Sequence, residues 1–543
     1  MNYLNCNSSR FGLLCLLLFA GIAMLSAQNS MPLLCTMYGE FDGAQLGKFL
    51  ASLDFNGDGI DDLVALEAVW NPDGVYGSPN GTFGRINFYW GGEGFDANLD
   101  ASISGEVREY VTGYLVSLGD INNDGKEDLA YVGLLSHTHI KLSIFLGRDE
   151  PDPVPDYELS YPYPGDIRGI TVRPLGDINS DGFDDVGITI GRRYTESEFL
   201  ILDGSSMNLI PEGTCMAGTH LIHMGGIGDV NGDGYDDYLI SRILQATGGL
   251  HNRITVFFGR ESIPPCDSLV ITEDTNGLID TFVGPLGDLN GDGIDDFLGW
   301  KGQDFKIWYG SSALMPEWDL FVPDNLYSMG ACSYVLIHGD YNGDGYSDMI
   351  SSSPNYGADG SAFLWLGGAN MNGTYDMRFY APHSISEKFG WDKAAGDFNN
   401  DGFCDVAISQ PYADPDPIRT PGRVHVYLGN AGLTDTTVSN EDDVLPPVDQ
   451  ASLWDIRISP NPVSVNNPCI TINFIGQGYK ELQKVRIEVF NVKGQMISNL
   501  EVDHVSLASG RYFTRFHELS SGLYFLKISD QRGSVISRKF VIN

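Results

Sequence analysis

Short apolar or alternating stretches recur along the whole chain, and turns rich in Gly, Asp and Asn separate them. Residues 63–66, 86–91, 144–147 and 424–429 are examples of such stretches. An apolar-polar alternation with a period of two is typical of β-strands, and no long run with a helical period stands out. The pattern predicts an all-β protein made of many short strands.

One segment repeats seven times, at intervals of 52 to 66 residues. The seven copies begin at Asp54, Asp120, Asp177, Asp229, Asp288, Asp340 and Asp397. This interval fits a sheet of four strands and is too long for a solenoid repeat. We therefore predict a seven-bladed β-propeller over residues 31–430. We expect a strand near Leu33 to Tyr38 to close the ring by pairing with the last blade.

Each copy of the repeat has the form Asp-x-Asn-x-Asp-Gly-x-x-Asp. Calcium prefers six to eight oxygen ligands, and positions 1, 3, 5 and 9 supply side-chain oxygens. Gly at position 6 permits a sharp turn with positive φ. Position 7 varies freely, which is expected if it offers only its backbone carbonyl. We predict about seven structural Ca²⁺ ions, held by Asp54, Asn56, Asp58, Ile60, Asp62, Asp120, Asn122, Asp124, Lys126, Asp128, Asp177, Asn179, Asp181, Phe183, Asp185, Asp229, Asn231, Asp233, Tyr235, Asp237, Asp288, Asn290, Asp292, Ile294, Asp296, Asp340, Asn342, Asp344, Tyr346, Asp348, Asp397, Asn399, Asp401, Phe403 and Asp405.

Two other interpretations of these loops are weaker. Asp, Asn and Gly are common turn formers, but seven copies with the same positions fixed are difficult to explain in that way. An EF-hand needs Glu at position 12, where Ala65 and Tyr131 stand in the first two loops. Position 8 is acidic in five loops but is Ser347 and Cys404 in the last two, so we do not expect it to be a ligand.

The formal net charge of −40 would repel phosphate backbones and anionic membranes, so we expect no nucleic-acid partner. Residues 1–27 resemble a signal peptide, with an apolar run from Phe11 to Ile22 and small residues before the expected cleavage site. That run is too short for a comfortable membrane span, and no second candidate follows it.

The repeats resemble the FG-GAP repeats of the integrin α-subunit propeller and its bacterial relatives. The match is best in Lys388-Phe-Gly-Trp391, in the loop that follows it, and in Gly422 to Gly429. The first repeat has Leu46-Gly47 in place of Phe-Gly. The resemblance covers about residues 31–430 and implies a calcium-binding propeller.

The character of the sequence changes after Gly429. Residues 431–453 are rich in Thr, Asp, Ser and Pro and read as a linker, while residues 454–543 predict a small immunoglobulin-like β-sandwich. This segment carries a Pro-Asn-Pro motif, then Val-Phe-Asn-Val-Lys-Gly, then Gly-Leu-Tyr-Phe and a basic final strand. Their order resembles the type A C-terminal sorting domain of the type IX secretion system. The resemblance implies export across the outer membrane and contact with that secretion machinery.

No catalytic motif is found, and two His pairs, His137 with His139 and His220 with His223, lack a third metal ligand. Four aromatic residues in expected loops could line a carbohydrate or protein site: Trp70, Tyr76, Tyr356 and Tyr412. We expect a secreted or cell-surface adhesion module for an extracellular protein or glycan, not an enzyme. A secreted polysaccharide-active lyase or hydrolase and a structural surface-layer component remain as alternatives.

Overall fold

A computed structural model of the 543-residue chain describes most of the residues between Ser30 and Ile542. The described ranges are residues 30–41, 43–74, 83–104, 113–135, 139–162, 167–192, 198–211, 220–246, 249–265, 267–274, 283–301, 304–316, 318–322, 337–354, 360–369, 371–380, 388–412, 421–434, 455–459, 469–475, 484–491, 496–503, 511–515, 522–530 and 535–542. The expected signal peptide and most of the expected linker lie outside them. In these ranges, no helix is long and apolar enough to cross a membrane.

Seven antiparallel sheets of four strands follow one another along the chain. Six of them take their strands in chain order: β2 (Leu46–Leu53), β3 (Asp62–Glu67), β4 (Arg85–Tyr89) and β5 (Ala101–Ser104); β6 (Gly113–Ser117), β7 (Leu129–Leu135), β8 (His139–Phe145) and β9 (Tyr157–Pro162); β10 (Ile167–Gly176), β11 (Asp185–Arg192), β12 (Glu198–Asp203) and β13 (Asn208–Pro211); β14 (His220–Gly228), β15 (Asp237–Ala246), β16 (Gly249–Phe257) and β17 (Ser268–Asp274); β18 (Val283–Gly287), β19 (Asp296–Lys301), β20 (Asp304–Trp308) and β21 (Leu320–Val322); β22 (Ile337–Gly339), β23 (Asp348–Ser353), β24 (Ser361–Trp365) and β25 (Met377–Tyr380). The seventh sheet has the order β1 (Leu33–Tyr38), β28 (Arg423–Tyr427), β27 (Asp405–Gln410) and β26 (Lys393–Gly396).

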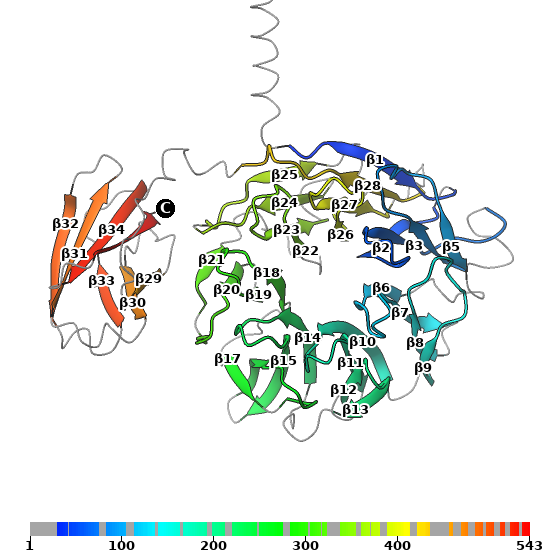
Figure 1. The fold of residues 1–543 in the computed structure, drawn as a ribbon, viewed down its shortest axis with the longest axis horizontal. Coiled ribbons are helices and arrows are strands. Elements are labelled where there is room, and N and C mark those ends of the chain that lie inside the picture. The colour runs from blue at the N-terminus through cyan, green and yellow to red at the C-terminus, as the bar shows by residue number, and fades with distance from the viewer. Residues whose placement is uncertain are drawn as a thin grey trace, which may run out of the picture. The chain divides into compact units, whose positions relative to one another are not determined.

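The first strands of the seven repeats form the inner wall of a ring (Figure 1). Each of them contacts the first strand of the next repeat, in the order β2, β6, β10, β14, β18, β22 and β26, and β26 contacts β2 again. The remaining strands of each sheet lie progressively farther from the centre. The chain therefore folds as the seven-bladed β-propeller that its repeats predict.

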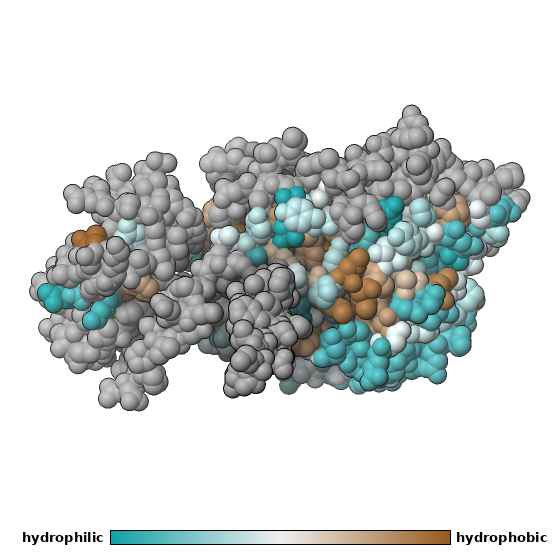
Figure 2. Space-filling model, turned by 90° about the horizontal axis from the view of Figure 1, so that it is seen from above, coloured by the Kyte–Doolittle hydropathy of each residue, from teal (hydrophilic) through white to brown (hydrophobic). Residues whose placement is uncertain are grey.

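The ring closes where strand β1 pairs with β28, so that the first and last parts of the propeller share one sheet. Met37 faces Val424 in this pairing and is fully buried. The expected closure by residues near Leu33 to Tyr38 is thus confirmed. The outer residues of β1 include exposed Leu33 and Tyr38, and Figure 2 shows this side, with apolar residues in brown among polar residues in teal.

The hydrophobic core lies between neighbouring sheets, because one sheet alone cannot bury its faces. One buried cluster joins the second and third sheets and includes Val132, Ile144, Val172 and Ile188. Other clusters join the first sheet to the second and the seventh sheet to the first. Each large apolar side chain that is buried between blades contributes about 1.5–3 kcal/mol to stability, and these contributions hold consecutive blades together.

The C-terminal strands form two further sheets. One has the order β29 (Asp455–Ser459), β30 (Cys469–Ile475) and β33 (Arg511–Arg515); the other has β32 (Met496–Asp503), β31 (Lys484–Asn491), β34 (Gly522–Asp530) and β35 (Val535–Ile542). Alternate residues of β31 and β34, among them Ile487 and Leu526, are fully buried, as expected for strands with one face toward a core. These sheets form the predicted β-sandwich.

Candidate metal-binding loops

Every Asp-rich loop joins the first strand of its sheet to the second. In the first sheet, residues 54–61 connect β2 to β3, and Asp62 begins β3. The other six loops occupy the same place in their sheets. Since each loop follows the first strand of its sheet, the loops lie at the same end of all seven sheets.

The backbone of the loops turns where the sequence predicts it. Gly at position 6 has a φ between 84° and 90° in all seven loops, which confirms its expected role. Position 4 also has positive φ in every loop, which the sequence analysis did not predict. The residues at position 4 are Gly57, Asn123, Ser180, Gly232, Gly291, Gly343 and Asn400. Their restriction to Gly, Asn and Ser was the visible signal, since Asn tolerates this conformation better than most residues.

The Asp at position 1 organises each loop around its own carboxylate. In the first loop, Asp54 Oδ1 accepts the N–H of Asp58 at 3.0 Å, and its Oδ2 accepts the N–H of Gly59 at 2.8 Å. The Asp at position 5 also accepts a backbone N–H: Asp58 Oδ1 accepts that of Ile60 at position 7. These three bonds recur in all seven loops.

The Asp at position 9 is buried in every loop and anchors the loop to its sheet. In the first loop, Asp62 Oδ1 accepts the N–H of Gly91 after the third strand, and its Oδ2 accepts the N–H of Phe55. The first of these bonds recurs in all seven sheets. Position 9 therefore has a structural role beside its predicted role as a ligand.

The oxygen donors of these loops suit a hard cation such as Ca²⁺ in their chemistry. Three buried oxygens in the described loops, Asn231 Oδ1, Asp185 Oδ2 and Asp405 Oδ2, lack a hydrogen-bond partner. Burial, together with the neighbouring carboxylates at positions 1 and 5, raises the pKa of Asp237 and of Asp296 to about 8. A bound cation would satisfy both needs.

The loop side chains are not already gathered around one point. Among the described residues, no three His, Cys, Asp or Glu side chains converge closely enough to hold a metal ion. The carboxylates at positions 1 and 5 instead accept backbone N–H groups. Binding of a cation would therefore require side chains to turn within loops whose backbone is already in place.

The side chain at position 8 links each loop to its neighbour in the ring. In five places its carboxylate accepts the backbone N–H of the position-1 Asp in the preceding loop, at 2.8 to 3.1 Å. The pairs, with the donor first, are Asp54 with Glu127, Asp120 with Asp184, Asp177 with Asp236, Asp229 with Asp295, and Asp397 with Asp61. The last pair crosses the closure of the ring. We call this set of contacts the loop belt.

The side chains at position 8 explain the Gly that precedes six of the seven loops. A Cβ atom on Gly228 would lie 2.1 Å from Asp295 Oδ2, so a side chain there would displace the carboxylate. The first loop is the exception, since Leu53 precedes it. The carboxylate that reaches this loop belongs to Glu127, whose side chain is one methylene longer than Asp.

Two junctions of the loop belt lack a carboxylate. Ser347 and Cys404 occupy position 8 in the sixth and seventh loops, although their backbone N–H groups still donate to Asp288 and Asp340. Burial and nearby carboxylates raise the pKa of the Cys404 thiol well above its usual range. The expectation that position 8 is not a ligand remains untested, but its contacts give it another role.

The other candidate residues have different outcomes. Trp70 donates from Nε1 to Glu40, and Arg85 lies over its ring, so it belongs to a local ion-pair network. Tyr412 packs against Trp391. Tyr76, Tyr356 and His137 lie outside the described residues. His139, His220 and His223 lie in strands, and the structure adds no ligand to either pair among the residues that it describes.

Two parts of the chain match known families. Residues 389–427 match the FG-GAP repeat, and residues 457–543 match the secretion system C-terminal sorting domain. The propeller therefore contains an FG-GAP repeat in its last sheet, and the C-terminal sorting domain indicates a secreted or cell-surface protein. That domain implies an interaction with the secretion machinery.

Curated relatives share only part of their length with this chain. A phosphatidylinositol-glycan-specific phospholipase D of Dictyostelium discoideum is 29% identical over 124 residues, which are 19% of this chain and 13% of the relative. Integrin alpha-V of Gallus gallus is 26% identical over 228 residues, which are 37% of this chain and 20% of the relative.

Similar solved structures include an α-L-arabinanase of Penicillium chrysogenum complexed with arabinobiose, with 9% identity and a TM-score of 0.36. That match covers 73% of this chain and 98% of the arabinanase. A Trypanosoma rangeli sialidase has 10% identity and a TM-score of 0.34, over 94% of this chain and 84% of its own.

Proposed function

We propose that the propeller is a calcium-stabilised binding module that presents an extracellular ligand site outside the cell and does not catalyse a reaction. One observation carries the calcium part: seven loops repeat one donor set on one backbone conformation, and three of their buried oxygens lack a partner. The positions proposed to hold the ions are 1, 3, 5 and 9 through side chains and 7 through its carbonyl.

The binding part of the proposal rests on the division of roles between the two ends of the sheets. The Asp-rich loops at one end are tied to their own sheets and to each other through the carboxylates at positions 9 and 8. Such loops act as clips between strands, which leaves the opposite end free to vary and to bind a ligand. Export through the sorting domain would place this end in contact with extracellular proteins and glycans.

Protein and glycan arrays probed with the full-length chain, in calcium and in excess chelator, test this proposal. We expect binding that is lost with the chelator, and no product when the same ligands are assayed for turnover. A rate of polysaccharide cleavage that scales with protein concentration would instead support the enzyme alternative. Absence of any ligand in all arrays would contradict the binding module.

A further inference from the structure

Four side chains meet where the first and last sheets of the ring adjoin: Lys48, Lys388, Trp391 and Tyr412. Lys48 lies near the start of β2, Lys388 and Trp391 precede β26, and Tyr412 follows β27. The Asp-rich loops follow the first strands, so this lysine–aromatic cluster lies at the opposite end of the sheets. All four side chains are half-buried.

The two aromatic rings hold both ammonium groups in one place. Trp391 and Tyr412 pack edge to face, with ring centroids 4.5 Å apart. Lys48 Nζ lies 4.1 Å from the centroid of Tyr412 and 5.0 Å from that of Trp391. Lys388 Nζ lies 5.3 Å and 5.4 Å from the same two centroids. Cation–π attraction thus places two positive charges against the same pair of rings.

The backbone that presents the cluster is tightly constrained. Gly47 has a φ of 80°, and a Cβ there would lie 2.8 Å from Val424 Cγ2, so only Gly lets β2 approach the last sheet this closely. Lys388 has a φ of 57°, a left-handed conformation that is uncommon for Lys. Such backbone strain is often found at functional sites.

The two lysines face each other without a carboxylate between them. Among the described residues, no carboxylate lies within ion-pair distance of Lys48 or Lys388. The neighbouring Asp392 is buried and accepts the N–H of Leu50 instead. Burial and the charge of Lys388 lower the pKa of Lys48 to about 8, which an anion at the cluster would counteract.

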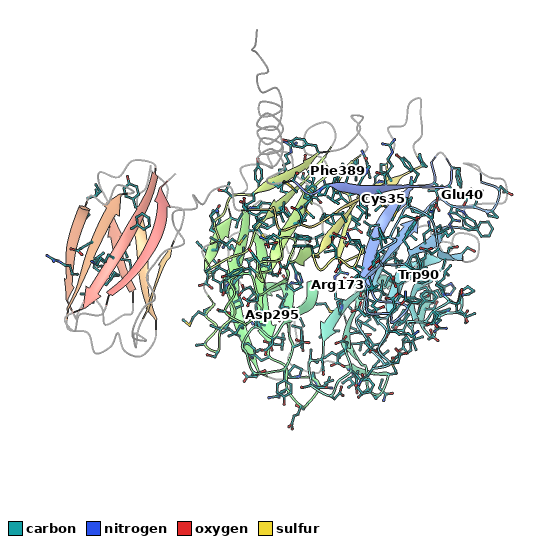
Figure 3. The ribbon with its side chains drawn as sticks, turned by 45° about the horizontal axis from the view of Figure 1, so that its top comes forward. Cys35, Glu40, Trp90, Arg173, Asp295 and Phe389 are labelled. Carbon is teal, nitrogen blue, oxygen red and sulfur yellow. The ribbon has the colours of Figure 1, made fainter. Side chains whose placement is uncertain are left out.

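The strands that form the inner wall of the ring also lack acidic residues. The chain has 72 acidic residues, but the seven first strands contain none of them. They contain Lys48, Arg173 and Lys393, of which Lys393 is buried, donates to Ser352 Oγ and lies near the buried Asp392. Figure 3 shows Arg173 toward the middle of the ring. Because the first strands contain no acidic residue, Lys48 and Arg173 would draw an anionic ligand toward this wall.

We propose that the lysine–aromatic cluster binds the carboxylate or sulfate group of an acidic polysaccharide. Two ammonium groups side by side match one such anion through charge-assisted hydrogen bonds. A long polymer with a phosphate at every unit would be repelled by the net charge of −40, whereas a short acidic oligosaccharide carries few charges and meets less repulsion. The half-buried rings of Trp391 and Tyr412 offer apolar surface to the sugar ring next to the anion. This inference rests on the proposed role of the propeller as a binding module.

Calorimetric titration of the full-length protein in calcium tests the proposal with four probes. They are a galacturonic acid oligomer, its neutral methyl ester, a sulfated galactose oligomer and an acidic peptide of equal charge. We expect the carboxylated or the sulfated oligomer to bind, and to bind at least about tenfold more tightly than the ester and the peptide. Lys48→Gln and Lys388→Gln should each weaken that binding about tenfold or more, since each removes one charge-assisted contact.

Lys306→Gln is the matched control, because Lys306 also lies over an aromatic ring, that of Trp318, in another sheet. It should leave binding unchanged, and all three variants should keep the melting temperature of the parent chain. Equal affinity of the parent and the two cluster variants would overturn the proposal, as would preference for the ester or the peptide, or no binding of any probe. If the arrays nevertheless show a ligand whose binding ignores Lys48, the binding module stands and only this site fails.

Discussion

At the scale of single residues, the spacing of the repeat reflects two different demands on the same loop. Positions 1, 5 and 6 organise the turn itself, while position 8 reaches the next loop in the ring. Because the position-8 side chain of the next loop, whether Asp, Ser347 or Cys404, occupies the space of a Cβ, the residue before each loop must be Gly unless that side chain is longer. The first loop follows Leu53 and not Gly, and the carboxylate that reaches it belongs to the longer side chain of Glu127.

Gly228→Ala should destabilise the propeller by about 2 kcal/mol or more, because it adds a Cβ at the Asp295 carboxylate and strains a φ of 74°. Gly74→Ala is the control, since Gly74 has a φ of 64° but no atom within 4 Å of the added Cβ. It should cost only the conformational part, about 1 kcal/mol. The midpoint of urea unfolding in calcium measures both, and equal costs would contradict a steric role for the loop belt.

Asp295→Ala should cost about 1–2 kcal/mol, because it leaves the N–H of Asp229 without its charged acceptor. Ser347→Ala removes only a hydroxyl group, at the same position of a loop whose junction has no carboxylate. We expect it to change the urea midpoint by less than half as much. A larger effect at Ser347 than at Asp295 would show that the carboxylate contact is not what stabilises these junctions.

At the scale of strands and loops, much of the fold could be predicted because each repeat has the same order of strand-forming stretches and one Asp-rich loop. The seven sheets, the closing strand from Leu33 to Tyr38 and the turn at position 6 all follow from local periodicity and glycine chemistry. The loop belt could not be predicted in this way. It joins residues such as Asp397 and Asp61 that meet only when the ring is closed.

The lysine–aromatic cluster was equally hidden in the sequence, apart from Tyr412. Lys48 and Trp391 each follow the Gly of their repeat, at Gly47 and Gly390. Both glycines have positive φ near 80°, and the residues before them form matching isolated bridges to the sheet on the preceding side. Leu46-Gly47 therefore takes the place of Phe-Gly in the first repeat. The contact between Lys48 and Trp391 nevertheless depends on which blades become neighbours.

The closing strand gives a prediction at this scale. Met37→Asp should destabilise the propeller by about 3 kcal/mol or more, because it buries an unpaired charge in the core between the last and first sheets. Tyr38→Asp is the control, since Tyr38 is 54% exposed on the same strand. The urea midpoint and the rate of proteolysis should both change in the first variant and hardly in the second. Similar behaviour of the two would argue against a closing role for β1.

At the scale of the whole molecule, the propeller is a ring in which each sheet relies on two neighbours. Apolar clusters join consecutive sheets, and the loop belt joins their Asp-rich ends. A ring of this kind is only as stable as its weakest junction, and Ser347 and Cys404 mark two adjacent junctions without the carboxylate contact. A cation in each loop would stiffen the position-1 Asp, and in the third loop this residue, Asp177, donates its N–H to Asp236 Oδ2 and accepts the N–H of Asp236 at its carbonyl.

Removal of calcium should therefore lower the melting temperature of the full-length protein sharply. For an extracellular site with a Kd of about 0.1 mM at about 1 mM calcium, binding contributes about 1.4 kcal/mol. Seven independent sites would together contribute about 10 kcal/mol, which is comparable with the stability of a whole domain. Differential scanning calorimetry in calcium, in excess chelator and after calcium is restored measures the effect.

Magnesium should restore little of the lost stability, because it demands shorter bonds and a stricter geometry than calcium. A melting curve that does not change in excess chelator would refute the calcium role of these loops, and a full recovery with magnesium would refute their selectivity.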